Sequence, residues 1–149
     1  MKAVLQRVRR GNVAVAGEIV GEIGSGYVIL LGIAHGDGPA EIKKLAEKTA
    51  RLRVFEDAQG KMNLSALDIE AEILVISQFT LLAETKKGRR PSFTQAAPPD
   101  IAAPLVEQFA ARLRVLGVKK VATGIFGGTM LVAIENDGPV TIILDTDHL

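Results

Sequence analysis

Apolar residues in the first third of the chain recur at every second position, which is the spacing of half-buried β-strands. One run departs from this alternation: Tyr27 to Ile33 (YVILLGI) is continuously apolar, as expected of a strand buried on both faces. Gly11-Asn12 and Gly17 separate the shorter runs. The expected strands are Ala3–Val8, Val13–Ala16, Glu18–Ile23 and Tyr27–Ile33. Together they predict a meander of short antiparallel strands.

Two segments have the 3.6-residue periodicity of amphipathic helices. The first follows Asp37-Gly38-Pro39, which supplies a turn and a proline suited to the first helical position, and it extends to about Leu52. The second is expected from Ile101 to about Leu116. Asp100 is expected to cap its N-terminus, and Gly117 is expected to end it.

The remaining apolar runs predict further strands. The run from Ala71 to Leu82 is strongly apolar, although its end carries polar residues. Four other strands are expected at Arg53–Phe55, Lys119–Thr123, Thr129–Asn136 and Val140–Asp145. A basic loop spans Glu84 to Pro99, and long irregular segments of this kind tend to be functional. The pattern predicts one α+β domain over residues 1–149, with curved antiparallel sheets and two main helices packed outside.

Charge and composition narrow the classes of function. The chain has 18 Lys and Arg against 17 Asp and Glu, so any nucleic-acid site must come from local clustering. One cluster within five residues comprises Lys86, Lys87, Arg89 and Arg90. Cysteine is absent, which excludes disulfides, a Cys nucleophile and Cys-ligated zinc. The chain shows neither a signal peptide nor an apolar run that could span a membrane, so we expect a cytoplasmic protein.

Few residues suit acid–base or metal chemistry. The histidines are His35, in a turn-like segment, and His148, beside the last residue, so a Ser-His-Asp relay is not indicated. The sequence has no cluster of metal ligands and no glycine-rich phosphate loop. Gly24-Ser25-Gly26 is better interpreted as a hairpin turn than as a phosphate cradle. We therefore expect neither a metal nor a cofactor.

Two segments remain unusual. Ser77, Gln78 and Thr80 interrupt the end of a strand that should be buried, where an unpaired polar group costs about 1–3 kcal/mol. Asn136-Asp137-Gly138-Pro139-Val140-Thr141 places an X–Pro bond after an Asp-Gly turn signal. Taken alone, each segment has a structural interpretation that we favour. The first would be a solvated strand end, and the second a hairpin turn between the last two strands.

Taken together and in this order, the two segments resemble the D-aminoacyl-tRNA deacylases. The resemblance covers almost the whole chain and rests on short motifs that are weak singly and specific in combination. They include MKAVLQRV at the start, KMNLS at 61–65, SQFTL at 77–81, KGRRPSF at 87–93 and NDGPVT at 136–141. The chain departs from the family pattern at Leu82, where Tyr is common, and at Gly128-Thr129, where the family often has Ala-Asp. Both departures lie where they would alter pocket shape.

The resemblance implies a three-layer β/β/α fold, with curved, barrel-like antiparallel or mixed sheets and two main helices on one side, that forms a two-fold homodimer. Each active site would lie at the dimer interface, where SQFTL of one subunit faces the Gly138-Pro139 motif of the other. The Gly138-Pro139 bond would be cis. Its carbonyls would bind the substrate ammonium and exclude an L side chain, so D-amino acids and glycine mischarged on tRNA(Ala) would be hydrolysed. The implied substrate-binding residues are Arg7, Met130, Asn136, Gly138, Pro139, Val140 and Thr141.

The same resemblance assigns catalysis to Ser77, Gln78, Phe79 and Thr80. Backbone N–H groups around Phe79 and Thr80 are candidates for an oxyanion hole. Attack comes either from Thr80 or from water assisted by the 2′-hydroxyl of the tRNA 3′ end. We favour the second route, because the chain is poor in candidate bases. Lys86, Lys87, Arg89 and Arg90 would contact tRNA phosphates, although a merely solvated loop is nearly as good an interpretation.

Two rival hypotheses remain beside the ester hydrolase. One is a module that binds RNA without cleaving it, which would explain the basic loop but not the pairing of SQFTL with Gly138-Pro139. The other is an oligomeric scaffold, in which both motifs are only turns and strand ends.

Overall fold

A computed structural model describes residues 1–86 and 88–149 of the chain. Its first half is organised around one long strand, β1 (Lys2–Val15), which pairs antiparallel with β2 (Glu18–Ile23) and then with β3 (Gly26–Gly32). Ala16 and Gly17, both with positive φ, form the turn that joins β1 to β2. Because β2 and β3 follow one another along the same side of β1, the chain does not reverse between them.

Two sequence predictions in this region were therefore wrong. Gly24-Ser25-Gly26 is not a hairpin turn but a break between two strands that run in the same direction. Gly11-Asn12 does not separate two strands but lies inside β1. A Cβ added at Gly11 would meet Val28 Cγ2 at 2.5 Å, so this glycine permits a close approach within the curved sheet.

The C-terminal strand β8 (Met130–Asp145) runs antiparallel to β1 along its other side. It pairs from Met130 opposite Val15 to Asp145 opposite Lys2. The hairpin turn predicted at Asn136–Thr141 was wrong, because Val8 pairs with Asn136 and Gln6 pairs with Thr141. The four intervening residues, 137–140, thus lie opposite Arg7 as an irregularity within one continuous strand.

Parallel pairing completes the sheet. β6 (Glu72–Ser77) runs parallel to β3, and β7 (Val121–Thr123) runs parallel to β6. The sheet thus continues from β1 through β3 and β6 to β7, with β2 paired to the second half of β1 on the same side as β3 and with β8 on the opposite side of β1. The sheet is therefore mixed, and the antiparallel meander predicted from the sequence is limited to its N-terminal part. The strand predicted from Ala71 to Leu82 ends at Ser77 and is followed by a 3-10 turn, η1 (Phe79–Leu82).

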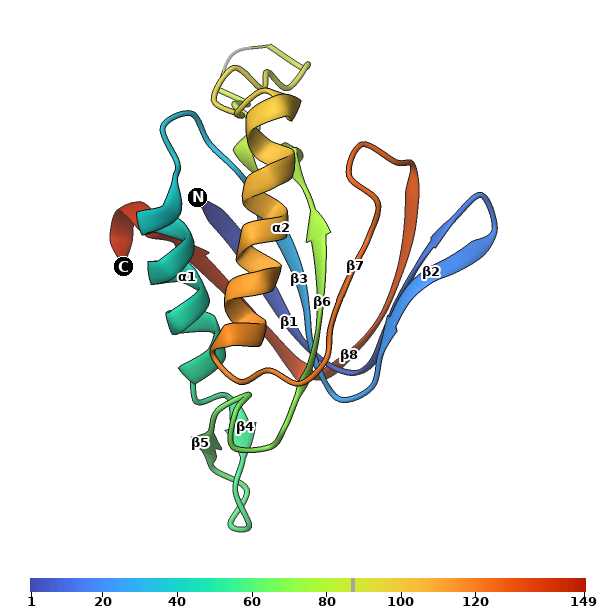
Figure 1. The fold of residues 1–149 in the computed structure, drawn as a ribbon, viewed down its shortest axis with the longest axis vertical. Helices are drawn as coiled ribbons and strands as arrows, with labels where there is room; N and C mark the ends of the chain where they lie inside the picture. The colour runs from blue at the N-terminus through green and yellow to red at the C-terminus, as the bar shows by residue number, and fades with distance from the viewer. Residues whose placement is uncertain (87) are drawn as a thin grey trace.

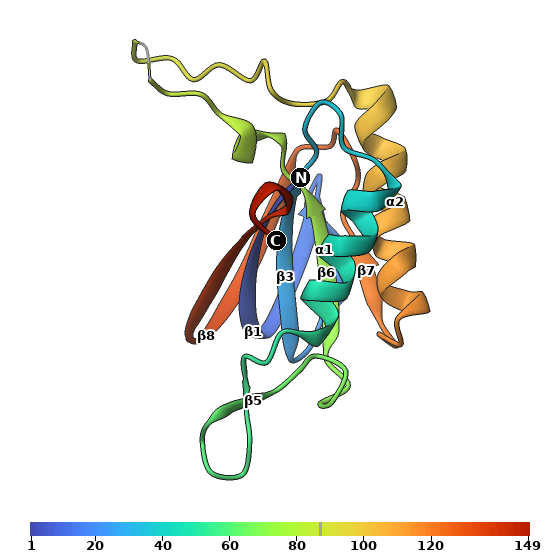
Figure 2. The ribbon, with the colours of Figure 1, turned by 90° about the vertical axis from the view of Figure 1, so that its left-hand side faces the viewer.

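Helices α1 (Pro39–Arg51) and α2 (Pro99–Val115) cover one face of this sheet (Figures 1 and 2). The predicted capping role of Asp100 was wrong, because Pro98 occupies the N-cap position and Asp100 lies in the first turn. One hydrophobic core lies between the helices and the sheet and includes Ile29, Leu45 and Phe109. A second core, which includes Val13 and Leu74, fills the concave side of the curved sheet.

The sheet is nearly closed into a barrel. A Cβ added at Gly21 of β2 would meet the carbonyl oxygen of Thr123 in β7 at 2.9 Å, so β2 and β7 approach each other closely although they are not paired. The curved, barrel-like mixed sheet with two helices on one side agrees with the α+β fold expected from the sequence. A short hairpin of β4 (Phe55–Glu56) and β5 (Met62–Leu64) extends beyond the end of the sheet (Figure 1).

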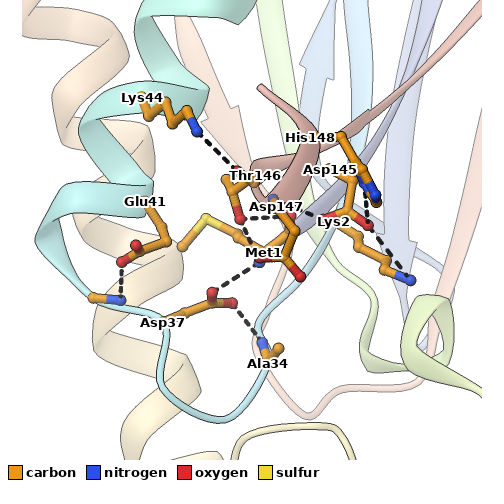
Figure 3. Close-up of polar contacts among 11 residues, drawn as sticks. Met1, Lys2, Ala34, Asp37, Glu41, Lys44, Asp145, Thr146, Asp147 and His148 are labelled. Carbon is orange, nitrogen blue, oxygen red and sulfur yellow. Dashed lines mark hydrogen bonds and ion pairs between the residues drawn. The ribbon is translucent and has the colours of Figure 1, made fainter.

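The two ends of the chain meet beside α1 (Figure 3). The Met1 amino group donates to Asp37 Oδ1 and to Thr146 Oγ1, both at 2.8 Å. Thr146 begins the terminal 3-10 turn η2 (Thr146–His148), and its carbonyl accepts from Lys44 Nζ at 2.9 Å. Asp37 Oδ2 accepts from the Ala34 N–H at 2.6 Å. Ala34 in turn bridges to Ala96, so this cluster supports the wall of the pocket described next.

Candidate active site

A pocket of about 640 Å³ opens at the C-terminal end of β6. Its lining is mainly apolar and comes from segments far apart in the sequence: the ends of β3 and β6, the loop before α2, and the β7–β8 connection. Ser77, Gln78, Phe79 and Met130 all line it, as their assignment to the site requires. Concave, largely apolar pockets with a few polar groups at the rim are the usual form of a ligand site.

The polar residues that interrupt the apolar run lie where β6 ends, at Ser77, and where the chain then changes conformation. The Gln78 N–H still donates to Leu31 O at 2.7 Å, continuing the sheet, and η1 begins at the next residue. The first N–H groups of a helical turn have no partner within that turn, and here they belong to Phe79 and Thr80. The end of β6 is thus followed by two backbone donors, one of which belongs to Phe79, a residue that lines the pocket.

Thr80 is exposed, and its hydroxyl is bonded to the side-chain amide of Gln78. An amide has no basic atom that takes a proton from a hydroxyl at neutral pH. His35 is exposed in the loop after β3, and its backbone N–H donates to Gln95 O at 3.0 Å. The Thr80 contact that the structure shows therefore does not activate this residue as a nucleophile.

Two of the aromatic residues at the pocket, Phe93 and Phe126, were not singled out as site residues by the sequence analysis. Three of the five phenylalanines of the chain line it: Phe79, Phe93 and Phe126. The rings of Phe79 and Phe93 meet edge to face with their centroids 5.0 Å apart, although Phe79 remains 57% exposed. The scarcity of aromatic residues was the available signal, because the two remaining phenylalanines, Phe55 and Phe109, are buried in the core.

The Gly138-Pro139 motif occupies the irregular part of β8, and its peptide bond is cis, as the resemblance implied. Arg7 of β1 is buried beneath it with 5% of its surface exposed. Arg7 Nε donates to Asp137 O at 3.2 Å, and Nη1 donates to Val54 O at 2.6 Å. Gly138 has a φ of +114°, and a Cβ there would lie 2.8 Å from Arg7 Nη2, so only glycine fits.

Asn136, Val140 and Thr141 lie on either side of Gly138-Pro139 in this motif. With its amide oriented to suit its neighbours, Asn136 donates to Arg7 O at 2.9 Å and to Val140 O at 3.3 Å. Val140 is buried, whereas Thr141 is exposed. Tyr27, which pairs with Arg7 across the sheet, has a buried hydroxyl. Burial raises the pKa of Tyr27, and the nearby Arg7 guanidinium partly opposes that rise.

The two motifs do not meet within one chain. Ser77 pairs with Leu31, whereas Arg7, beneath Gly138, pairs with Tyr27, four residues along β3. Gly138 also lies on β8, which is separated from β6 by β1 and β3. At the usual spacings within a sheet, the motifs are therefore roughly 20 Å apart. Met130 lies with the SQFTL segment, and the remaining predicted substrate-binding residues lie with Gly138.

The basic loop leads from η1 to Phe93. Lys86, Arg89 and Arg90 are exposed, and Lys87 lies outside the described residues. The backbones of Glu84 and Ser92 bond to each other in both directions, at 2.7 and 3.0 Å, and close the base of the loop. The loop residues on either side of position 87 extend away from the sheet (Figure 2). The cations are thus held in solvent beyond the pocket.

Two further observations concern classes of function. Within residues 1–86 and 88–149, no three His, Asp or Glu side chains gather as a metal site would require. The helices of this same part of the chain are too short or too polar to cross a membrane.

Comparison with known proteins identifies one matching family and several similar proteins. The model of the D-Tyr-tRNA(Tyr) deacylase family matches residues 4–145. A protein of Chloroflexus aurantiacus named D-aminoacyl-tRNA deacylase is 58% identical over 149 residues, covering 100% of this chain and 92% of the relative. A protein of the same name from a Roseiflexus species is 61% identical over 146 residues, covering 98% and 94%.

Solved structures agree with the fold. One described as a c-Myc DNA unwinding element binding protein has a TM-score of 0.92 and 44% identity, covering 97% of this chain and 98% of that one. Another, described as a probable eukaryotic D-amino acid tRNA deacylase, has a TM-score of 0.80 and 21% identity, covering 96% and 97%. At that identity, the second likeness concerns the fold alone.

Proposed function

Because this chain belongs to the D-Tyr-tRNA(Tyr) deacylase family, and is accordingly a hydrolase of carboxylic ester bonds, we propose that it removes D-amino acids from tRNA. The products are the free D-amino acid and the tRNA, and the reaction corrects tRNAs charged with the wrong enantiomer. With tRNA as its substrate, the proposed location of the protein is the cytoplasm. The observation that carries the proposal is the start of η1 at the pocket: Phe79 lines an apolar pocket, and its backbone N–H and that of the next residue, Thr80, begin the turn.

The two N–H groups suit an oxyanion hole. Ester hydrolysis develops negative charge on the carbonyl oxygen, and fixed backbone donors stabilise it without having to reorganise. Removing one such donor typically costs about 10²–10³ in kcat. The Gln78 N–H bond to Leu31 fixes the start of η1 against the sheet and so keeps these donors in place.

Water is the proposed nucleophile, assisted by the 2′-hydroxyl of the terminal ribose. The Thr80 hydroxyl lies against the Gln78 amide rather than against a base. An aminoacyl ester is already reactive, so positioning and charge stabilisation account for much of the acceleration. The protein contributes the pocket and the donors, and the substrate contributes the proton-transferring hydroxyl.

A homodimer is proposed to complete the site. The roughly 20 Å between SQFTL and Gly138 in one chain is too long for both to contact one aminoacyl group. A two-fold pairing brings Gly138-Pro139 of one subunit to the SQFTL segment of the other. Among residues 1–86 and 88–149, β8 pairs only with β1, and its side chains Leu131 and Ile143 are about three-quarters exposed and offer an apolar surface for that contact.

Chiral selection is proposed to come from backbone atoms of Gly138 and Pro139. Rigid carbonyls bind the substrate ammonium and occupy the space of an L side chain, which rejects the L-ester by a clash. Arg7, Asn136, Val140 and Thr141 support that backbone, and Met130 lines the pocket. Glycine lacks a side chain to exclude, so glycine mischarged on tRNA(Ala) is a substrate in this proposal.

The basic loop is proposed to contact the tRNA. Lys86, Arg89 and Arg90 lie in solvent beyond the pocket, as contacts to phosphates near the 3′ end would require, and Lys87 is assigned with them by sequence alone. Binding through such contacts weakens steeply as salt concentration rises.

The test is the release of amino acid from D-Tyr-tRNA and L-Tyr-tRNA at equal enzyme concentration with a chelator present. Rapid loss of the D-ester alone is the expected result. Equal loss of both esters would retain an esterase but discard the chiral role of Gly138 and Pro139. If neither ester were lost while the protein was folded, binding of nucleic acid without cleavage would replace the proposal.

A further inference from the structure

Asp137, the residue before Gly138, places its carboxylate between two arginines of β1. Oδ1 accepts from Arg9 Nε at 3.0 Å, and Oδ2 lies 3.4 Å from Arg7 Nε. The same Arg7 Nε also donates to the carbonyl oxygen of Asp137 at 3.2 Å. Arg7 is thus held by both the side chain and the main chain of one residue, at the peptide that leads into Gly138.

The surroundings of Arg7 make the Asp137 carboxylate important for its position. Arg7 is buried, and a buried guanidinium is destabilised unless opposite charges and acceptors lie close to it. Besides Asp137, Arg7 contacts the Val54 carbonyl, 2.6 Å from Nη1, and the Glu56 carboxylate, 3.7 Å from Nη2. Glu56 is more than half exposed, so solvent screens its charge. Asp137 is therefore the closer and less exposed of the two carboxylates that pair with Arg7.

Arg9 differs from Arg7 in being 81% exposed, yet it acts on the same carboxylate. Its Nε bond fixes one oxygen of Asp137 and leaves the other oriented toward Arg7. Arg9, Asp137 and Arg7 thus form a chain of charges that runs from the surface to the buried underside of Gly138. A Cβ built on Gly138 would lie only 2.8 Å from Arg7 Nη2, so this guanidinium packs directly against the glycine.

We propose that Asp137 is a positioning residue for enantiomer selection: held by Arg9, its carboxylate keeps Arg7 against the carbonyl before Gly138 and thereby fixes the Gly138-Pro139 backbone. The inference rests on the proposed function. Rejection of an L side chain by a clash requires that the blocking atoms do not yield, and displacements of less than 1 Å relax such a site. Without the carboxylate, Arg7 leans toward Glu56 and the backbone before Gly138 becomes free to move.

The experiment compares kcat/KM for D-Tyr-tRNA and L-Tyr-tRNA in Asp137→Asn, which keeps the shape of the side chain and removes its charge. The expected result is a fall of at least tenfold in the D-over-L ratio, with faster hydrolysis of the L-ester. Asp137→Glu, which retains the charge, keeps the ratio within threefold of the wild type. The matched control is Glu135→Gln, which removes the exposed Arg10–Glu135 pair on the same two strands and leaves the ratio unchanged.

The outcomes separate this inference from the function on which it rests. A wild-type protein that does not distinguish the esters would overturn the proposed function, and the role of Asp137 with it. A selective wild type alongside a folded Asp137→Asn variant of equal selectivity would overturn the role of Asp137 alone. An equal fall in Asp137→Glu or in Glu135→Gln would do the same, because the Asp137 charge would then not be the cause. If Asp137→Asn did not fold, the exposed Arg9→Gln variant decides: the ratio falls at least threefold, and an unchanged ratio overturns the inference.

Discussion

The Met1 amino group and the Asp37 carboxylate form a buried ion pair with a distance of 2.8 Å between Met1 N and Asp37 Oδ1. The pair joins the start of β1 to the loop before α1, and the second Asp37 oxygen holds the Ala34 N–H (Figure 3). The Asp37 carboxylate thus connects the start of the sheet, the loop that leads into α1, and the wall of the pocket.

Replacing Asp37 by Asn should lower the free energy of unfolding by about 3–5 kcal/mol, the range typical of removing one partner of a buried ion pair. The Asn side chain is neutral, so the buried Met1 ammonium loses its counter-charge. The NH₂ group of the new amide would also face another donor, either the Met1 amino group or the Ala34 N–H. Urea denaturation at neutral pH measures the change. Asp147→Asn, at an exposed position in η2, is the control and should shift the free energy by less than about 0.5 kcal/mol. Equal stability of the two variants would contradict the structural role of the pair.

Glu72 should make stability sensitive to acid. Its carboxylate accepts from the Gly24 N–H at 2.7 Å and pairs with Lys120 Nζ at 3.0 Å, and these contacts hold the pKa of Glu72 below its usual range. A carboxylate whose pKa is lowered by folding stabilises the protein fully above its unfolded pKa, near about 4.3. That contribution is lost as pH falls through the lower pKa of the folded state.

Glu72→Gln removes this titration, so its stability should fall less steeply than that of the wild type as pH decreases below about 4.3. Urea midpoints measured at several pH values between neutrality and acid provide the test. Parallel curves for the two proteins would show that Glu72 does not contribute to acid sensitivity.

The sequence predicted those elements in which the local residue pattern agreed with the pairing of distant strands. The apolar runs identified β3 and both helices, because burial imposes a periodicity that survives in any context. Gly11-Asn12 and Asn136–Thr141 carry turn signals, yet both lie inside strands. β1 and β8 pair along their whole lengths, and this pairing overrides the local preference for a turn.

The candidate site was predictable only in part for a similar reason. Ser77 and Gln78 stood out because polar residues ended an apolar run. Phe93 and Phe126 did not stand out, since their place at the pocket depends on how two distant connections pack against β6. The contacts of Asp137 with Arg7 and Arg9 likewise depend on the register between β1 and β8, which no local pattern specifies.

Gly138→Ala should impair both stability and enantiomer selection. The new Cβ would lie 2.8 Å from Arg7 Nη2 at a φ of +114°, so steric overlap adds to the backbone penalty of roughly 1–2 kcal/mol for a left-handed residue. Gly60→Ala is the matched control, because Gly60 also has positive φ, at +74°, and a Cβ there meets nothing within 4 Å. Both variants should lose stability, but only Gly138→Ala should change the ratio of D-Tyr-tRNA to L-Tyr-tRNA hydrolysis. A change of ratio in both would indicate a general loss of structure.

Thr80→Ala distinguishes the two chemical routes. If water attacks with help from the substrate 2′-hydroxyl, removing the Thr80 hydroxyl leaves both backbone donors in η1 intact, and single-turnover hydrolysis of D-Tyr-tRNA should stay within about tenfold of the wild type. A tRNA ending in 2′-deoxyadenosine, with the amino acid on its 3′-oxygen, should instead react about 10²–10⁴-fold more slowly, the usual range for losing a proton-transferring group. A nucleophilic Thr80 predicts the opposite pattern: the alanine variant would lose turnover, and the deoxy substrate would react normally with the wild type.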